Sequence, residues 1–249
     1  MLKKLFLYSL IISTSLYGTS INVAVAANVS YAIDKLKKEF KLLHPNTRVK
    51  IILASSGALT AQIKHGAPYQ IFMSANMKYP EALYSDKIAI TKPLIYAKGS
   101  LAYFSTKKLN YSLGMNLLKE DSISKIAIAN PKTAPYGKAA YEAIKKFGIL
   151  DEVKNKFVYA QSISQTVSYI ITATDIGFIA KSSLYSPHMK KYKKDINWID
   201  VDTKLYKTIN QGIVILNNAK DNNDAKKFYD FILSDKAKKI FKDFGYIVE

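Results

Sequence analysis

Residues 49–66 read VKIILASSGALTAQIKHG, and this stretch decides the fold. The apolar run VKIILA predicts a buried strand, and the amphipathic run ALTAQIKHG that follows predicts a helix. Ser55, Ser56 and Gly57 fall at the junction between the two. A phosphate-binding loop would place a lysine directly after its glycines, whereas the first cation after Gly57 is Lys64. We therefore expect that an anion bound at this helix start is held by neutral donors.

The same alternation of apolar and amphipathic stretches continues along most of the chain. The apolar runs INVAVAA (21–27), VKIILA (49–54) and QIFMSA (70–75) are each followed by an amphipathic stretch. Alternating strands and helices predict βαβ units, and therefore an α/β fold in which the sheet is mostly parallel and flanked by helices. Near the end of the chain, residues 224–245 predict one long closing helix.

Two lobes are predicted from the places where the alternation breaks. The runs LIYAKG (94–99) and LAYFST (101–106) have no helix between them, so one extended passage is expected to lead from a first lobe into a second. If the chain passes back from the second lobe into the first near residues 200–208, the remaining residues complete the first lobe. We predict a discontinuous lobe 1 at residues 21–99 and 206–249, a lobe 2 at residues 100–205, and a ligand cleft between them.

Residues 1–20 have the layout of a secretory signal peptide. Lys3 and Lys4 precede an apolar run that closes with small residues, and we expect cleavage between residues 18 and 21. The chain contains no cysteine, so it can form no disulfide and carries no lipid-attachment site behind the signal. We expect a periplasmic protein with no membrane anchor, and a monomer.

The formal net charge of +18 raises the alternative of a nucleic-acid or membrane-surface module. Arg48 is the only arginine, however, and the lysines are spread along the whole chain. Surfaces that read bases depend on the planar guanidinium fork of arginine. The sequence therefore favours no nucleic-acid partner, and this alternative ranks below the others.

An enzyme is the second alternative. The three histidines, His44, His65 and His188, lie far apart without metal-ligand spacing, and no G-x-S-x-G motif is present. The carboxylates of the segments DIGF (175–178) and WIDVD (198–202) are better explained as turn and strand-end residues than as a catalytic pair. We predict no catalytic residues, no cofactor and no site for a cationic metal.

Four predicted helices begin with the same chemistry, directly after a predicted strand. The first turn of a helix has unpaired N–H groups and the positive end of the helix dipole, so it attracts anions. Serine and asparagine are also the usual helix caps, which is the simpler explanation for any one of these sites. Four such starts with adjacent glycine or proline favour a shared anion site at the carboxyl ends of the strands. The segments are ANVS (27–30), SSG (55–57), NPKTAPYG (130–137) and QSIS (161–164).

The order and residue patterns of these segments resemble those of the periplasmic molybdate-binding proteins of ABC importers, over nearly all of the chain after the signal. ASSGALTAQIKHGAP (54–68) resembles that family's ASS-x-x-L-x-x-Q-I-x-x-GAP segment, and IFMSAN (71–76) its F-x-SA stretch. NPKTAPYGKAAYEAIKKFG (130–148) is similar to P-x-x-x-P-x-G-x-x-A-x-E-x-L-x-x-x-G, and AKKIFKDFGY (237–246) to A-x-x-I-F-x-x-YGF. The resemblance implies a two-lobed periplasmic-binding-protein fold of type II.

The resemblance also implies the residues that bind the ligand. By position, Asn28, Ser56, Tyr136 and Ile163 would contact the oxyanion, with the backbone of Ala27 as a further contact. Many relatives have serine at the position of Asn28 and an oxyanion-contacting tyrosine at the position of Ala180. A branch of the family that uses asparagine and tyrosine would accommodate both differences. The implied partners are an ABC permease and its ATPase.

The chemistry of these residues agrees with that implication. Molybdate near neutral pH is a tetrahedral dianion that only accepts hydrogen bonds, so donors alone can hold it. We expect the Asn28 amide and the Ser56 hydroxyl to donate, and Tyr136 and Ile163 to contribute their backbone N–H groups. Tungstate has nearly the same size and charge, and another oxyanion such as sulfate or phosphate stays the alternative ligand.

Overall fold

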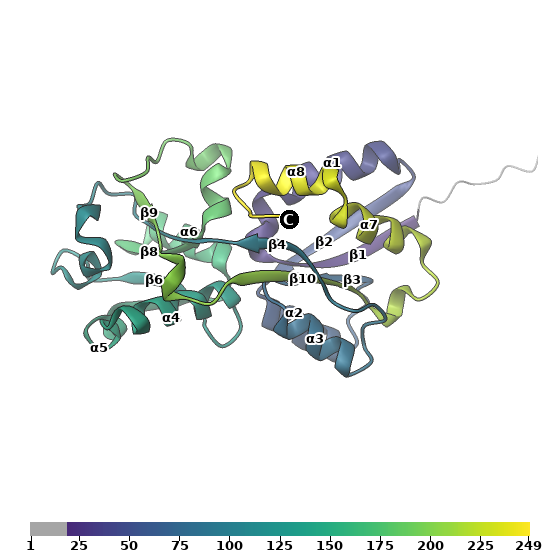
Figure 1. Ribbon diagram of the computed structural model, residues 1–249, viewed down its shortest axis with the longest axis horizontal. Helices are drawn as coiled ribbons and strands as arrows, with labels where there is room; N and C mark the ends of the chain where they lie inside the picture. Colours follow the sequence, from purple (N-terminus) through teal and green to yellow (C-terminus); the bar gives the residue numbers. More distant parts are fainter. Residues whose placement is uncertain (1–18) are drawn as a thin grey trace, which may run out of the picture.

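The computed structural model describes residues 19–249, and the chain forms two five-stranded sheets that lie side by side (Figure 1). The predicted signal peptide falls almost wholly on residues 1–18, outside the described residues. Thr19 and Ser20 already belong to the first strand. The prediction of a two-lobed α/β protein is confirmed by this arrangement.

The first sheet belongs to lobe 1, at the right of Figure 1, and is covered by helices on both faces. Its strands, in spatial order, are β2 (Thr47–Ala54), β1 (Thr19–Ala26), β3 (Ile71–Met73), β10 (Ile209–Ile215) and β4 (Leu94–Gly99). The helices of this lobe are α1 (Ile33–Leu43), α2 (Ser56–Lys64), α3 (Lys78–Ser85), α7 (Asn223–Leu233) and α8 (Asp235–Asp243).

Alternation along β1 builds the two faces of this lobe. Ile21, Val23 and Val25 are fully buried in the cluster that also contains side chains of α1, α7 and α8. Ala24, on the opposite face, is buried in the cluster formed with α2 and α3. Because successive residues of a strand point to opposite faces, the buried part of β1 needs apolar residues on both faces, which explains the run VAVA at residues 23–26.

The second sheet belongs to lobe 2 and is built on the same plan. Its strands, in spatial order, are β7 (Phe157–Ala160), β6 (Ile126–Ala129), β8 (Ile176–Ala180), β5 (Leu101–Phe104) and β9 (Trp198–Asp200). Its α-helices are α4 (Pro135–Phe147), α5 (Leu150–Val153) and α6 (Ile163–Thr172). Short 3-10 helices complete the chain: η1 (Ala27–Tyr31), η2 (Tyr111–Lys119), η3 (Lys154–Lys156), η4 (Lys181–Tyr185), η5 (Pro187–Met189), η6 (Thr203–Leu205) and η7 (Asn217–Ala219).

Both sheets are more mixed than the predicted, mostly parallel ones. In lobe 1, β1 is parallel to β2 and β3, but β10 is antiparallel to β3 and β4. In lobe 2, β6 is parallel to β7 and β8, but β5 is antiparallel to β8 and β9. The antiparallel strands lie where the chain passes from one lobe to the other. Strand β4 leads through Ser100 into β5 of lobe 2, and β10 brings the chain back into lobe 1 (Figure 1). The sheets therefore divide the chain at Ser100 and between Asp200 and Ile209, and the residue-level boundaries inside that return stay a prediction.

The predicted closing helix at residues 224–245 is wrong as a single element. The chain breaks at Ser234, whose ψ of 158° is extended, and forms α7 and α8 instead. The Ser234 hydroxyl accepts from the Ala237 N–H at 3.4 Å and caps the second helix. Serine competes for backbone hydrogen bonds in this way, so it favours a cap over a helix interior.

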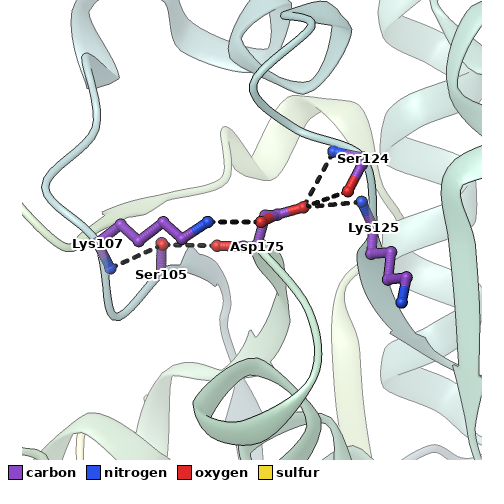
Figure 2. Close-up of polar contacts among 5 residues, drawn as sticks. All are labelled: Ser105, Lys107, Ser124, Lys125 and Asp175. Atoms are coloured by element: carbon purple, nitrogen blue, oxygen red, sulfur yellow. Dashed lines mark hydrogen bonds and ion pairs between the residues drawn. The ribbon is translucent and has the colours of Figure 1, made fainter.

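Asp175, the carboxylate of the segment DIGF, is held by structural contacts before β8 (Figure 2). One carboxylate oxygen accepts from the Ser124 hydroxyl at 2.9 Å and from the backbone N–H groups of Ser124 and Lys125, each at 3.0 Å. The other accepts from Lys107 Nζ at 2.6 Å. Desolvation opposes the charged form, but these donors outweigh it and lower the pKa of Asp175 well below its ordinary value. The residue ties the ends of the lobe 2 strands together, as a turn residue would.

None of the helices that the structure describes is both long and apolar enough to cross a membrane.

Candidate ligand-binding site

The four predicted helix starts lie at the carboxyl ends of two pairs of neighbouring parallel strands. In lobe 1, β1 and β2 end in register at Ala26 and Ala54, and η1 and α2 begin directly after them. In lobe 2, β6 and β7 end in register at Ala129 and Ala160, and lead to α4 and α6. Each lobe therefore presents two helix starts side by side, as the sequence predicts.

Helix capping explains only one of the four starts. Ser162 accepts from the Gln165 N–H at 3.4 Å and is a cap of α6. The residues preceding η1, α2 and α4 make no side-chain cap hydrogen bond. At α4 the first helical residue is Pro135, whose fixed φ suits a first helical turn. The polar side chains of Asn28 and Ser56 therefore serve another purpose than starting their own helices.

Asn28 is fully buried in η1 and lies in a polar network. Its side-chain Nδ2 donates to Gln211 Oε1 at 2.8 Å and to Tyr246 Oη at 3.1 Å. Its backbone carbonyl accepts from Tyr246 Oη at 2.8 Å and from Ser182 Oγ at 3.1 Å. Its Oδ1 is buried and has no hydrogen-bond partner within the part of the chain that the structure describes. A buried polar atom without a partner is costly, so this position calls for a ligand or a different arrangement of the amide.

Ser56 is also fully buried, at the first position of α2. Its Oγ accepts from the backbone N–H of Ala75 at 2.9 Å. A hydroxyl has one proton to give and two lone pairs, so this contact orients Ser56 and leaves its O–H able to donate. Its backbone N–H lies in the first turn of α2, where a helix provides no acceptor of its own.

Ala27, Tyr136 and Ile163 lie in one contiguous cluster of buried side chains that draws on both lobes. Their N–H groups are in the first turns of η1, α4 and α6. The phenol of Tyr136 accepts from Gln211 Nε2 at 3.2 Å. Burial, reinforced by neighbouring tyrosines, raises the pKa of Tyr136 well above its ordinary value, so the phenol stays neutral. These placements agree with a backbone contribution from Tyr136, as the sequence predicts.

The two lobes are in direct contact at these helix starts. The backbone N–H of Gly57 donates to Thr133 O across the lobes at 2.9 Å, and Tyr79 Oη donates to Lys132 O at 3.3 Å. At the other side, Ser182 Oγ of lobe 2 donates to Asn28 O of lobe 1. These contacts bring the helix starts of both lobes together.

A polar pocket of about 560 Å³ lies between the lobes next to three of these helix starts. It is lined by serines 30, 55, 162, 164 and 168, by glutamines 161 and 165, and by Tyr31, Leu53, Ala54 and Ala58. No acidic side chain and no lysine lines it, so its electrostatic character comes from neutral groups.

Lys138 and Lys181, which closely follow Tyr136 and Ala180 in the sequence, are engaged by carboxylates. Lys181, which follows Ala180, pairs with Asp200 at 2.7 Å, and Lys138 has a Glu142 oxygen at 3.8 Å. Asp200 in turn also pairs with Lys194 at 3.0 Å. The ammonium groups of both Lys138 and Lys181 therefore lie against carboxylates. Asp200, the other carboxylate considered for catalysis, is an ion-pair partner as well.

Metal ligands do not gather anywhere in residues 19–249: no group of three or more histidine, aspartate or glutamate side chains could hold a metal ion there. This agrees with the prediction that no cationic metal is involved, without testing it.

Gln211, which joins Asn28 to Tyr136, lies outside every motif of the sequence described above. Gln211 is fully buried in β10, directly before the apolar run GIVIL. A buried amide in a strand needs partners, and that is the signal in the sequence that could have pointed to it.

A two-lobed α/β chain in which helix starts of both lobes meet beside a neutral polar pocket has the architecture of a solute-binding protein. Residues 21–247 match the family of bacterial extracellular solute-binding proteins, and the chain belongs to that family.

Within this family, the chain is similar to proteins that bind molybdate. The molybdate-binding protein ModA of Azotobacter vinelandii is 32% identical, over 92% of this chain and 90% of the relative. The molybdate-binding protein ModA of Rhodobacter capsulatus is 31% identical, over 91% and 87%. The solved structure of the Azotobacter vinelandii periplasmic molybdate-binding protein superposes with a TM-score of 0.84 at 30% identity, over 92% of this chain and 99% of that one. The predicted resemblance is confirmed, and the chain belongs to the same family as these proteins.

Proposed function

We propose that this protein captures molybdate, and tungstate with it, between its two lobes and delivers the oxyanion to an ABC permease. The observation that carries the proposal is the convergence of four helix starts, two from each lobe, where the lobes touch. The two molybdate-binding relatives at 31–32% identity support the choice of ligand.

The proposed contacts are the five residues predicted from the sequence: Ala27, Asn28, Ser56, Tyr136 and Ile163. All five are buried, with at most 4% of their surface exposed. A donor-only set suits a fully ionised tetrahedral dianion, because every oxygen of the ligand is an acceptor. Monoprotonated phosphate would direct its O–H at groups that cannot accept it.

The protein is proposed to be a transport component and not an enzyme, because the family's members are solute-binding proteins and the acids considered for catalysis are tied in structural contacts. The oxyanion is its cargo, and no cofactor is required. The periplasmic relative supports a periplasmic location after signal cleavage. The chain would act as a monomer that docks on the permease, with an ATPase subunit supplying the energy.

Salt should have little effect on molybdate binding if neutral donors hold the ligand. Screening acts on exposed charges beyond about 8 Å at physiological ionic strength, and far less on enclosed hydrogen bonds. Calorimetric titration of molybdate at about 50 mM and about 500 mM sodium chloride should give one site per chain, and an affinity that changes less than about fivefold.

The matched variants for this titration are Lys138→Ala and Lys181→Ala. Both should bind molybdate like the unmodified protein, since each ammonium group lies against a carboxylate. Loss of most of the affinity in either variant, or across the salt series, would refute the neutral-donor mechanism. A titration without saturable binding would refute the proposed ligand.

Ser56→Ala should weaken molybdate binding by about 1 to 3 kcal/mol, the usual contribution of a hydrogen bond to a charged group. The variant removes the proposed hydroxyl donor from the start of α2. Ser85→Ala is the control, because Ser85 is an exposed serine of the same lobe at the end of α3, away from the pocket. Equal affinities of the Ser56→Ala and unmodified proteins would show that the hydroxyl has no part in binding.

A further inference from the structure

Gln211 occupies the junction between the lobes. It lies in β10, the strand that brings the chain back into lobe 1, and its side chain is fully buried. Its Oε1 lies 2.8 Å from Asn28 Nδ2 and 2.8 Å from Tyr96 Oη. Its Nε2 lies 3.2 Å from Oη of Tyr136, which belongs to lobe 2. One amide thus contacts a proposed ligand-binding side chain and the opposite lobe at once.

This hydrogen-bond network has three mismatches when the amides are oriented as described above. Asn28 Oδ1 is buried and has no donor among residues 19–249. Among residues 19–249, Tyr136 Oη takes part only as an acceptor, so its own proton finds no partner there. Tyr96 Oη has one proton but faces two acceptors, Gln211 Oε1 at 2.8 Å and Ser74 O at 3.3 Å.

Reversing both amides removes the mismatches at Tyr136 and Tyr96, and replaces the unpaired oxygen of Asn28 with an unpaired nitrogen. The oxygen and nitrogen of an amide have nearly the same shape, so the network of partners decides the orientation. The side-chain amides of Asn28 and Gln211 are each rotated by 180°, so that oxygen and nitrogen exchange places. Gln211 Nε2 then donates to Asn28 Oδ1 and to Tyr96 Oη. In turn, the hydroxyl of Tyr136 donates to Gln211 Oε1. Tyr96 then gives its proton to Ser74 alone. The backbone carbonyl of Asn28 keeps the donor Ser182 Oγ, so Tyr246 can donate to Asn28 Oδ1.

The reversal also changes the unpaired atom of the Asn28 amide from a hydrogen-bond acceptor to a donor. The atom without a partner becomes an N–H₂ group, a buried donor that faces away from Gln211. An unpaired donor at that point is what an anion requires, whereas an unpaired carbonyl oxygen would repel it.

We propose that Gln211 is a positioning residue, which directs the Asn28 amide so that its N–H₂ faces the bound oxyanion. This inference rests on the proposed function, since it assigns a role within the same site. Gln211 also bonds Tyr136 of lobe 2, so the correct amide orientation is fixed only when the lobes are together. Capture of the anion and closure of the lobes are thereby coupled through one side chain.

A double-mutant cycle with Gln211→Met and Asn28→Ala tests the inference by molybdate titration of the full mature chain. Methionine keeps the length of glutamine but removes its donor and acceptor. Each single variant should lose about 10- to 100-fold in affinity, the usual range for a lost hydrogen bond to a charged group. If Gln211 acts through Asn28, the double variant should bind within about threefold of Asn28→Ala. Multiplied losses, or an unchanged affinity in Gln211→Met, would overturn the inference.

Two further variants keep the test decisive. Gln62→Met is the matched control, because this exposed glutamine accepts its side-chain hydrogen bond from Tyr69 of its own lobe, and the affinity of the variant should be unchanged. Gln211→Glu preserves the shape of the side chain if the methionine variant does not fold. Its carboxylate can only accept, so it should hold Asn28 in the wrong orientation and lose more affinity at pH 8 than at pH 6, where a buried carboxyl gains a proton. If Gln211→Glu bound molybdate as tightly as the unmodified protein at both pH values, the inference would be overturned. If the unmodified protein itself bound no molybdate, the proposed function would be overturned as well.

Discussion

Replacing Gly57 with valine is expected to remove most of the affinity for molybdate while leaving the ligand-free protein fully folded. A Cβ at this position would lie 2.7 Å from Tyr79 Oη and 2.9 Å from Thr133 Cα. Thr133 belongs to the opposite lobe, so the added side chain would hold the lobes apart. Because apparent affinity falls with the fraction of closed protein, a closure penalty of about 2.7 kcal/mol corresponds to about 100-fold weaker binding.

The folded state itself should not suffer from this change. Gly57 is the second residue of α2 and has a helical backbone, where any residue other than proline is at least as favourable as glycine. Ala61→Val on the exposed side of the same helix is the control, and it should bind normally. Thermal unfolding without ligand and calorimetric titration with molybdate separate the two effects. Normal affinity in Gly57→Val would show that the contact between Gly57 and Thr133 is not needed for binding.

Local patterns were sufficient to predict most of the fold. The run INVAVAA is buried on both faces of its sheet, and only a strand covered on both sides needs such a sequence. The mixed character of the sheets could not be read locally, because β10 pairs with strands more than a hundred residues earlier in the chain. The break at Ser234 was missed because the apolar spacing of α7 and α8 continues across it, and only the cap distinguishes two helices from one.

The candidate site was predictable where its residues follow a strand directly. Ser56 and Ile163 lie at helix starts that small and hydroxyl residues mark in the sequence. Gln211 gave no such signal, since its role depends on contacts with Asn28 and Tyr136, 183 and 75 residues away. The close approach of Gly57 to Thr133 is equally non-local. Contacts between residues of different lobes depend on how the two lobes pack together, and no single segment of the sequence determines that packing.

Molybdate and tungstate are expected to bind at least about 100-fold more tightly than sulfate. The shorter sulfur–oxygen bonds would leave sulfate out of reach of some donors in a site fitted to the larger ions. Losing two such contacts at about 1.4 kcal/mol each gives a factor of about 100. Phosphate should bind weakly for a different reason, because its O–H finds no acceptor in a donor-only site.

The most direct test of the account is a calorimetric competition with the mature protein at pH 8. Molybdate, tungstate, sulfate and phosphate are titrated separately, and molybdate is then titrated in the presence of excess sulfate. A donor-only site built for the larger dianions predicts tight one-to-one binding of molybdate and tungstate that excess sulfate does not prevent. Tight binding of sulfate or phosphate with no response to molybdate would contradict it.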